Sequence, residues 1–137
     1  AVILATHDVS EALAIADRVA LVRDGRLVQV GSPLEVYDRP VESWAAAMTG
    51  IASVLTAGAD ESLEPGGGGS ILVRPAWATL GGAREGSVSA VRFFGSHTDT
   101  TLETPFGRLV IRSLGGPSVS VGEPATWTLH RWWPLPG

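Results

Sequence analysis

The stretch AVILATHDVSEALAIADRVALVRDGRLVQVGSP, from Ala1 to Pro33, decides the fold of the first part of the chain. Its apolar run Ala1–Ala5 is rich in β-branched residues and is typical of a strand buried on both faces of a parallel sheet. Because such a strand needs neighbours, we expect further sequence to precede it. An amphipathic helix is predicted next, with Asp8 or Ser10 as its N-cap. Its apolar positions are Val9, Ala12, Leu13 and Ala16.

An Asp-Gly pair between two apolar runs predicts a β-hairpin after this helix. The runs are Val19–Val22 and Arg26–Val30, and Asp24-Gly25 lies between them. Both central positions of the two-residue turn favour positive φ, which Asp and Gly adopt more readily than other residues. We therefore expect two antiparallel strands that are joined by a tight turn.

A short helix is predicted directly behind the hairpin. Ser32 is its expected N-cap, Pro33 occupies its first position, and Glu35 completes a capping box. The helix is expected to end near Arg39-Pro40, because proline disfavours the helical conformation of the residue before it.

A second helix is predicted over Val41–Thr49, with Trp44, Ala47 and Met48 on one side and Gly50 as its C-cap. After Gly50, short β-rich segments with Gly and Pro between them replace the helical patterns, which is typical of a small barrel or sandwich. The sequence thus predicts an α/β part over 1–50 and a β domain over 51–137. The expected strands are Ile51–Thr56, Ser70–Pro75, Gly86–Phe94, Thr98–Thr104, Gly107–Arg112 and Pro124–His130.

Two of these strands carry more detailed predictions. In Pro124–His130 the alternation is clear, and Ala125, Trp127 and Leu129 are expected to face one way. In Gly86–Phe94 the alternation slips between Ala90 and Val91, which predicts a β-bulge.

The composition limits the functions that the chain can perform. The 137 residues carry a net charge of −4, so we expect no nucleic-acid-binding surface. All ten basic residues are arginine, which excludes a phosphate-binding loop of the GxxxxGK[ST] type because that loop needs a lysine. The sequence has no cysteine and therefore no disulfide or thiolate metal site. Its apolar runs are too short to span a bilayer.

His7 is the main candidate for a functional residue. It follows the apolar run and precedes the predicted helix, and ligands of α/β sheets bind at the carboxyl ends of strands. An imidazole there can donate a hydrogen bond to a phosphoryl oxygen or help to orient an attacking water. On position alone, a capping or packing role for this histidine stays open.

The residues around His7 resemble a known family, the ATP-binding subunits of ABC-transporter importers. His7 matches the histidine of that family's H-loop, which contacts the γ-phosphate of ATP in a nucleotide-sandwiched dimer and supports hydrolysis. The resemblance covers all of Ala1–Gly50. Its elements, in one order and at close spacing, are Thr6-His7-Asp8, Glu11-Ala12-Leu13, Asp17-Arg18, Asp24-Gly25-Arg26, Gln29-Val30-Gly31-Ser32-Pro33, Tyr37 and Arg39-Pro40.

The resemblance implies a larger protein. The Walker A, Q-loop, LSGGQ-type signature and Walker B motifs of the family are absent here, which implies that they precede Ala1 in an intact subunit. That subunit would bind ATP and Mg²⁺ and act as an ABC-type ATPase, whereas this chain alone is expected to bind neither and to be inactive. The implied partners are a second copy of the subunit, transmembrane permease subunits and, indirectly, an extracytoplasmic solute-binding protein. The subunit would lie peripherally at the cytoplasmic face of the plasma (inner) membrane.

The second half resembles the TOBE domain, an OB-like β domain that is attached to importer ATPases. Ile71-Leu72-Val73-Arg74-Pro75 is similar to its (V/I)RPE motif, with Ala76 in place of the usual glutamate. Phe93-Phe94-Gly95, Thr104–Arg108 and Val121–Pro124 match later turns of that domain. The family's domain regulates transport, mediates dimer contacts and sometimes binds substrate or a signalling protein. The shortness of this second half and its Trp-Trp-Pro-Leu-Pro-Gly ending most resemble the ATPases of ferric-iron importers and of their thiamine and polyamine relatives. The resemblance therefore implies iron(III) as the cargo.

Two other functions remain open from the sequence. The β domain alone could bind an oxyanion, a metal, thiamine, a polyamine or a regulatory protein without any catalysis. An enzyme complete in this chain would need a second group near His7, and the sequence offers Asp8 and Glu11 there.

For several further polar and aromatic residues, the favoured interpretation is an ordinary structural role. His97, Asp99 and His130 are expected at solvated strand positions rather than as metal ligands. Core packing or a dimer contact is favoured over base or sugar stacking for Trp127, Trp132 and Trp133. Gly66–Gly69 is expected to be a flexible loop, and Glu61, Glu64 and Glu85 are expected to be solvated loop charges.

Overall fold

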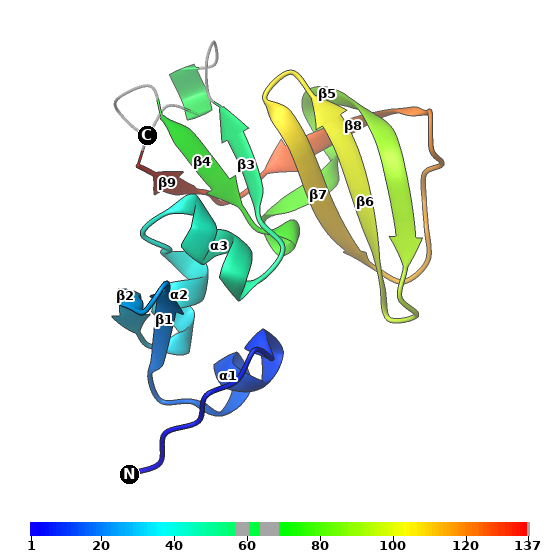
Figure 1. Ribbon diagram of the computed structural model, residues 1–137. Coiled ribbons are helices and arrows are strands. Elements are labelled where there is room, and N and C mark those ends of the chain that lie inside the picture. Colours follow the sequence, from blue (N-terminus) through cyan, green and yellow to red (C-terminus); the bar gives the residue numbers. More distant parts are fainter. Residues whose placement is uncertain (57–60, 64–68, 137) are drawn as a thin grey trace. The chain divides into compact units, whose positions relative to one another are not determined.

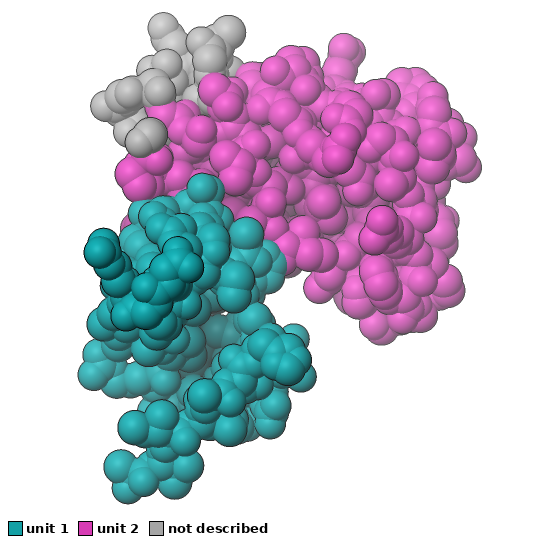
Figure 2. All heavy atoms as spheres, in the orientation of Figure 1, with its two compact units in different colours: residues 1–50 teal, residues 51–137 magenta. Residues whose placement is uncertain are grey.

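The computed structural model describes residues 1–56, 61–63 and 69–136. Two compact units make up the chain, residues 1–50 and residues 51–137, which Figure 2 shows in different colours. Unit 1 contains α1 (Val9–Ile15), β1 (Val19–Arg23), β2 (Arg26–Gly31), α2 (Pro33–Asp38) and α3 (Ser43–Thr49). Unit 2 contains β3 (Ser53–Thr56), β4 (Ser70–Val73), β5 (Ala78–Phe93), β6 (His97–Thr104), β7 (Gly107–Leu114), β8 (Pro124–Leu129) and β9 (Trp133–Leu135), with short 3₁₀ helices at Glu61–Leu63 and Pro75–Trp77.

The prediction of a strand over Ala1–Ala5 is wrong. Residues 1–6 lie outside any helix or strand, and their side chains are exposed, with Val2 at 95% and Ile3 at 97%. A strand forms only where a neighbouring strand takes its backbone hydrogen bonds, and the described strands pair elsewhere. The apolar run therefore stays uncovered.

The predicted helix after this run is confirmed, although it is short. Asp8 has extended φ and ψ, and its side chain accepts a hydrogen bond of 3.1 Å from the backbone N–H of Glu11. The predicted apolar positions are the ones that are half-buried, whereas the other residues of the helix are exposed. A helix of 7 residues is marginal by itself, so α1 depends on its cap and on this half-buried stripe.

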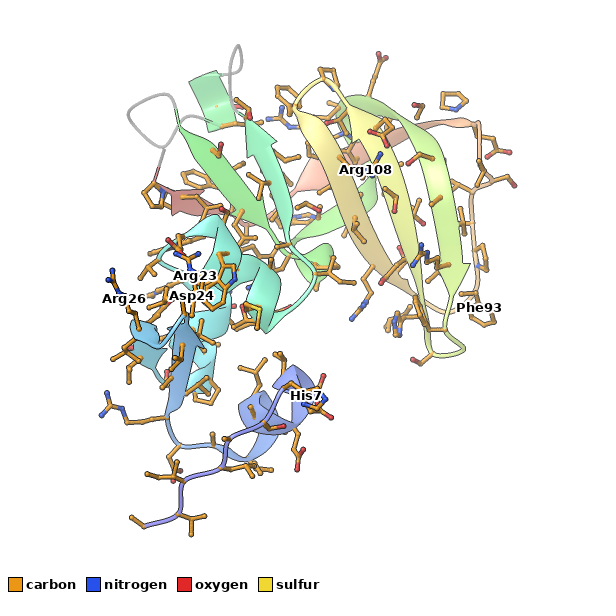
Figure 3. The ribbon with its side chains drawn as sticks, viewed as in Figure 1. His7, Arg23, Asp24, Arg26, Phe93 and Arg108 are labelled. Atoms are coloured by element: carbon orange, nitrogen blue, oxygen red, sulfur yellow. The ribbon has the colours of Figure 1, made fainter. Side chains whose placement is uncertain are left out.

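The hairpin forms as predicted. β1 and β2 pair antiparallel, with φ of 52° at Asp24 and 74° at Gly25, and the register shifts between Leu21 and Val22. Figure 3 shows Arg23, Asp24 and Arg26 at the end of the hairpin. The guanidinium of Arg23 lies 2.9 Å from a carboxylate oxygen of Glu42 and 4.8 Å from the ring centre of Trp44. This contact fixes the tip of the hairpin against the start of α3.

The capping box of α2 is also confirmed. The Ser32 side chain accepts from the backbone N–H of Glu35 at 3.2 Å, and the Glu35 carboxylate accepts from the backbone N–H of Ser32 at 2.8 Å. The hydrogen bond from the backbone N–H of Ser32 is the main cause that lowers the pKa of Glu35, and the Ser32 side chain adds to it. Arg39 is the C-cap of the helix, one residue before Pro40.

α3 is shorter than predicted and buries another side. Its first residue is Ser43 rather than Val41, and Gly50 with φ of 152° follows its last residue. The buried residues are Ala45, Ala46 and Thr49, while Ala47 and Met48 of the predicted apolar side are exposed and Trp44 is half-buried. Small side chains let the helix approach its neighbours closely, so they are buried in place of the large ones.

Unit 2 consists of two antiparallel sheets. Its described residues form no α-helix, as predicted. One sheet has the order β3-β4-β9, and the other has the order β7-β6-β5-β8, whose long strands lie side by side in Figure 1. The first half of β5 and all of β9 extend beyond the predicted strands. The bulge in β5 is confirmed, but it lies between Val88 and Ala90. A second irregularity lies between Leu80 and Arg84.

The core of unit 2 lies between its two sheets. Their edges meet where Thr56 donates a backbone hydrogen bond of 2.9 Å to Phe106, and where Val110 donates one of 2.9 Å to the Ser53 hydroxyl. This arrangement agrees with a small β domain, and its closer identification as OB-like stays a prediction. The largest wholly buried apolar side chains are Trp127, Leu55, Leu63, Ile71, Leu72, Leu102, Leu109 and Ile111. In the described part of the chain, no helix is long and apolar enough to cross a membrane.

Candidate functional site

His7 lies in the turn that leads into α1. The residue is exposed, and Figure 3 shows its side chain beside the first turn of the helix. Among the residues that the structure describes, none forms a hydrogen bond or ion pair with the imidazole. Both ring nitrogens are therefore available to a ligand, which argues against a packing role for this histidine within the chain.

The backbone on both sides of His7 is held by side chains. The backbone N–H of Asp8 donates to the hydroxyl of Thr6 at 3.0 Å, and the Asp8 carboxylate caps α1 through Glu11. The carbonyl of Asp8 accepts the first helical bond, 3.1 Å from the N–H of Ala12. The capping role that the sequence left open for His7 is filled by Asp8.

An enzyme complete in this chain gains no support from these neighbours. The carboxylate of Asp8 is engaged as the N-cap, and Glu11 contributes its backbone N–H to that same bond. The residues present do not fit ATP with Mg²⁺ by themselves, because a phosphate cradle needs backbone N–H groups and a lysine, and the chain has no lysine. Together, the described residues contain no cluster of three or more His, Asp and Glu side chains that could hold a metal ion.

The other polar candidates are structural, and the interpretation of Asp99 was wrong. Asp99 is not a solvated residue: its side chain is 6% exposed, and it accepts two bonds of 2.8 Å from Arg112. These bonds lower its pKa, with the hydrogen bond from Arg112 as the main cause. His97 contacts Ser96 through Nδ1 and stacks on Phe94, and His130 bonds Thr79 at 2.7 Å.

Among the tryptophans, Trp127 packs in the core. It is wholly buried and donates to the carbonyl of Glu85 at 3.3 Å, while the guanidinium of Arg84 lies 5.5 Å from its ring. Trp132 and Trp133 are half-buried, and their predicted part in a dimer contact stays a prediction. Glu85 is exposed but belongs to β5 rather than to a loop, and Glu61 belongs to a 3₁₀ helix. The predicted loop at Gly66–Gly69, apart from Gly69, and Glu64 lie outside the described residues.

Two residues with a clear structural role were missed by sequence reasoning. Arg112 is the partner of Asp99, and the pairing could have been inferred only from the β6–β7 register, which sets these residues opposite each other. Gln29 donates to the carbonyl of Arg39 and accepts from the N–H of Val41, both at 3.0 Å. It thereby bridges the break between α2 and α3, ten to twelve residues further along the chain.

Unit 1 also exposes many large apolar side chains. They come from the N-terminal segment, the helices, the link between α2 and α3, and both strands of the hairpin: Val2, Ile3, Leu4, Ile15, Val22, Leu27, Val30, Leu34, Val41 and Met48. These side chains are available to another part of a larger protein or to a partner.

Comparisons with known proteins found relatives that are import ATP-binding proteins. No protein-family profile matches the chain. It is 38% identical over 118 residues to the Fe(3+) ions import ATP-binding protein FbpC of Streptomyces avermitilis, which covers 74% of this chain and 34% of that protein. It is 34% identical over 143 residues to FbpC 1 of Rhodococcus jostii, covering 88% of this chain and 41% of that protein.

A polyamine protein is among the relatives as well. The chain is 30% identical over 130 residues to the spermidine/putrescine import ATP-binding protein PotA of Mesorhizobium japonicum, which covers 77% of this chain and 36% of that protein. The chain thus spans between a third and about two-fifths of the length of these relatives. Over roughly three-quarters of its length, it is homologous to ATP-binding subunits of ABC importers.

Proposed function

We propose that this chain is the C-terminal part of the ATP-hydrolysing subunit of an ABC importer. The observation that carries the proposal is its similarity to import ATP-binding proteins over 74% or more of its residues. Residues 1–50 would be the end of the nucleotide-binding domain, and residues 51–137 would be a TOBE-like domain with regulatory and dimerising roles. The exposed apolar surface of unit 1 supports this assignment, because the remainder of the nucleotide-binding domain would cover it.

In the intact subunit, His7 would act as the switch histidine. Its imidazole would donate a hydrogen bond to the γ-phosphate of ATP, which residues outside this chain would hold together with Mg²⁺. The exposed position of His7 in the turn before α1 supports this role, and so does the absence of a hydrogen bond from the described residues to its ring. A donor that is not already engaged can turn toward a phosphate without losing another contact.

The partners and the cargo follow from the same proposal. The intact subunit would form a homodimer on the cytoplasmic side of the membrane, contact transmembrane permease subunits and work with an extracytoplasmic solute-binding protein. Two of the relatives quoted are Fe(3+) import proteins, which supports iron(III) as the cargo, and the polyamine relative makes spermidine the first competitor to test.

The test replaces His7 by Ala in the full-length subunit, reconstituted with its permease. ATP hydrolysis and iron(III) uptake should be lost or severely reduced, while His130→Ala, a matched change of an exposed histidine in unit 2, should leave both unchanged. Wild-type hydrolysis by His7→Ala would contradict the assignment of His7. Uptake of spermidine but not of iron(III) would correct the cargo alone.

Calorimetry separates this proposal from a binding module without catalysis. The 137-residue chain is titrated with iron(III), molybdate, thiamine and spermidine. Tight stoichiometric binding of one of them, with no ATP hydrolysis by the full-length subunit, would favour the binding module. ATP hydrolysis by the full-length subunit, together with no detectable binding of any of the four compounds to the 137-residue chain, would favour the importer subunit.

A further inference from the structure

The turn that carries His7 is defined by two side chains, and both belong to its immediate neighbours. The hydroxyl of Thr6 accepts from the backbone N–H of Asp8 at 3.0 Å, so this bond closes a ring around the backbone of His7. The carboxylate of Asp8 accepts from the N–H of Glu11 at 3.1 Å and fixes where α1 begins. One bond restricts φ and ψ at His7, and the other marks where the helix begins.

Packing contributes little to the position of this turn. Residues 1–8 are exposed, and every residue of α1 is exposed or half-buried. The segment before Thr6 lies outside any helix or strand. In the part of the chain described here, the two side-chain bonds are therefore the local contacts that restrict the backbone of His7 most directly.

We infer that Thr6 and Asp8 are positioning residues for His7, holding its imidazole in the orientation in which it meets a phosphoryl oxygen. This inference rests on the proposed function. A hydrogen bond to a developing charge accelerates a reaction only when the donor is held in place beforehand, since the geometric tolerance is about half an ångström. Neither residue touches the nucleotide in this arrangement. Both act through the histidine.

The first experiment tests the geometry on the 137-residue chain itself, without any nucleotide. Backbone amide relaxation measured by NMR should give an order parameter near the rigid value of about 0.85 for His7 and Asp8 in the wild type. Thr6→Val, which keeps the shape but removes the acceptor, and Asp8→Ala should lower it to below about 0.6. Thr6→Ser and Asp8→Asn retain an acceptor oxygen and should restore it. Ser10→Ala is the matched control, because it removes an exposed hydroxyl from the same helical turn.

The second experiment measures ATP hydrolysis by the full-length subunit. Losing one such bond should lower the population of the active orientation, so kcat should fall about fivefold for Thr6→Val and for Asp8→Ala. KM for ATP should stay the same, because the residues outside this chain bind the nucleotide. Thr6→Ser and Asp8→Asn should recover most of kcat. This recovery separates a positioning role from a loss of folding. If Thr6→Val and Asp8→Ala lowered kcat by unfolding unit 1, a return of the acceptor oxygen alone would not restore activity.

A double variant shows whether the two residues act through the histidine. Thr6→Val added to His7→Ala should cause no further loss, since there is no imidazole left to orient. An additive loss, unchanged kcat in Thr6→Val, or unchanged order parameters in both variants would overturn the inference and leave the proposed function intact. Wild-type hydrolysis by His7→Ala alone would instead contradict the proposed role of His7, and this inference with it.

Discussion

Replacing Arg112 by Gln should destabilise unit 2 far more than the same change at Arg108. Both arginines lie on β7 and face a carboxylate on β6, with Asp99 opposite Arg112 and Glu103 opposite Arg108. Both ion pairs have an Nε–oxygen distance of 2.8 Å. The two pairs thus match in strand and in Nε–oxygen distance, and they differ in burial and in the number of hydrogen bonds.

The exposure of each pair sets the expected magnitude. The Asp99 side chain is 6% exposed and Arg112 is 40% exposed, and a second bond of 2.8 Å makes the pair bidentate. Removing one partner of a fully buried pair costs about 3–5 kcal/mol, so about 2–3 kcal/mol is expected here, where the guanidinium is partly in water. The Arg108 and Glu103 side chains are 72% and 45% exposed, and an exposed pair contributes less than about 1 kcal/mol.

Thermal unfolding followed by tryptophan fluorescence measures both changes, because four of the five tryptophans lie in unit 2. For a unit of this size, Arg112→Gln should lower Tm by about 10–20 °C, whereas Arg108→Gln should lower it by less than about 8 °C. Adding Asp99→Asn to Arg112→Gln should recover part of the loss, since the buried carboxylate is then removed as well.

The pH dependence gives an independent check of the same pair. The pKa of Asp99 is lowered in the folded state, so its pairing stabilises the fold above the unfolded pKa of about 4 and is lost as pH falls through the folded pKa. The difference between wild type and Arg112→Gln should therefore be largest near pH 7 and shrink in acid. Equal losses for the two arginine variants, or a difference that grows in acid, would refute the reasoning.

Three further predictions concern unit 1. Gln29→Ala should destabilise it by about 1–2 kcal/mol in urea unfolding followed by far-ultraviolet circular dichroism, because two backbone groups lose their partner, and Gln29→Glu should lose only the donated bond. Gly25→Ala, at φ of 74°, should cost about 1 kcal/mol in the same assay, whereas Gly116→Ala in open space should be neutral; equal effects would show that the hairpin turn relaxes. Ser32→Ala should raise the pKa of Glu35 toward its ordinary value in an NMR titration, since the serine side chain is one cause of the lowering, and an unchanged pKa would contradict the capping box.

Local rules predicted the parts of unit 1 that depend on neighbours in sequence. The Asp24-Gly25 turn, the Ser32 capping box and the Asp8 cap each involve residues within three or four positions of one another, so the sequence contains both partners side by side. For the same reason, His7 could be recognised as a candidate at the entrance to a helix. The Thr6 bond that closes the turn around it was not anticipated, although it spans only two residues.

Contacts between residues that are distant in the sequence could not be predicted from local rules. Asp99 looked solvated because its partner Arg112 is thirteen residues away, and only the β6–β7 register brings them together. β9 was missed because its partner β4 is about sixty residues earlier, and its own sequence, Trp-Pro-Leu, has no alternation to reveal a strand. α3 buries Ala45 and Ala46 because close approach to neighbouring elements, rather than side-chain hydrophobicity, decides which side of a helix faces inward.

The sequence by itself determined the turns, the caps, the positions of most strands and the place of His7, because each depends on φ/ψ preferences and hydrogen bonds between near neighbours. The tertiary structure decided which residues are buried and which charges are paired, because burial and pairing depend on strands that meet across long separations in the chain. The run Ala1–Ala5 shows the difference most clearly: its composition is that of a buried strand, but a strand exists only where another strand accepts its hydrogen bonds.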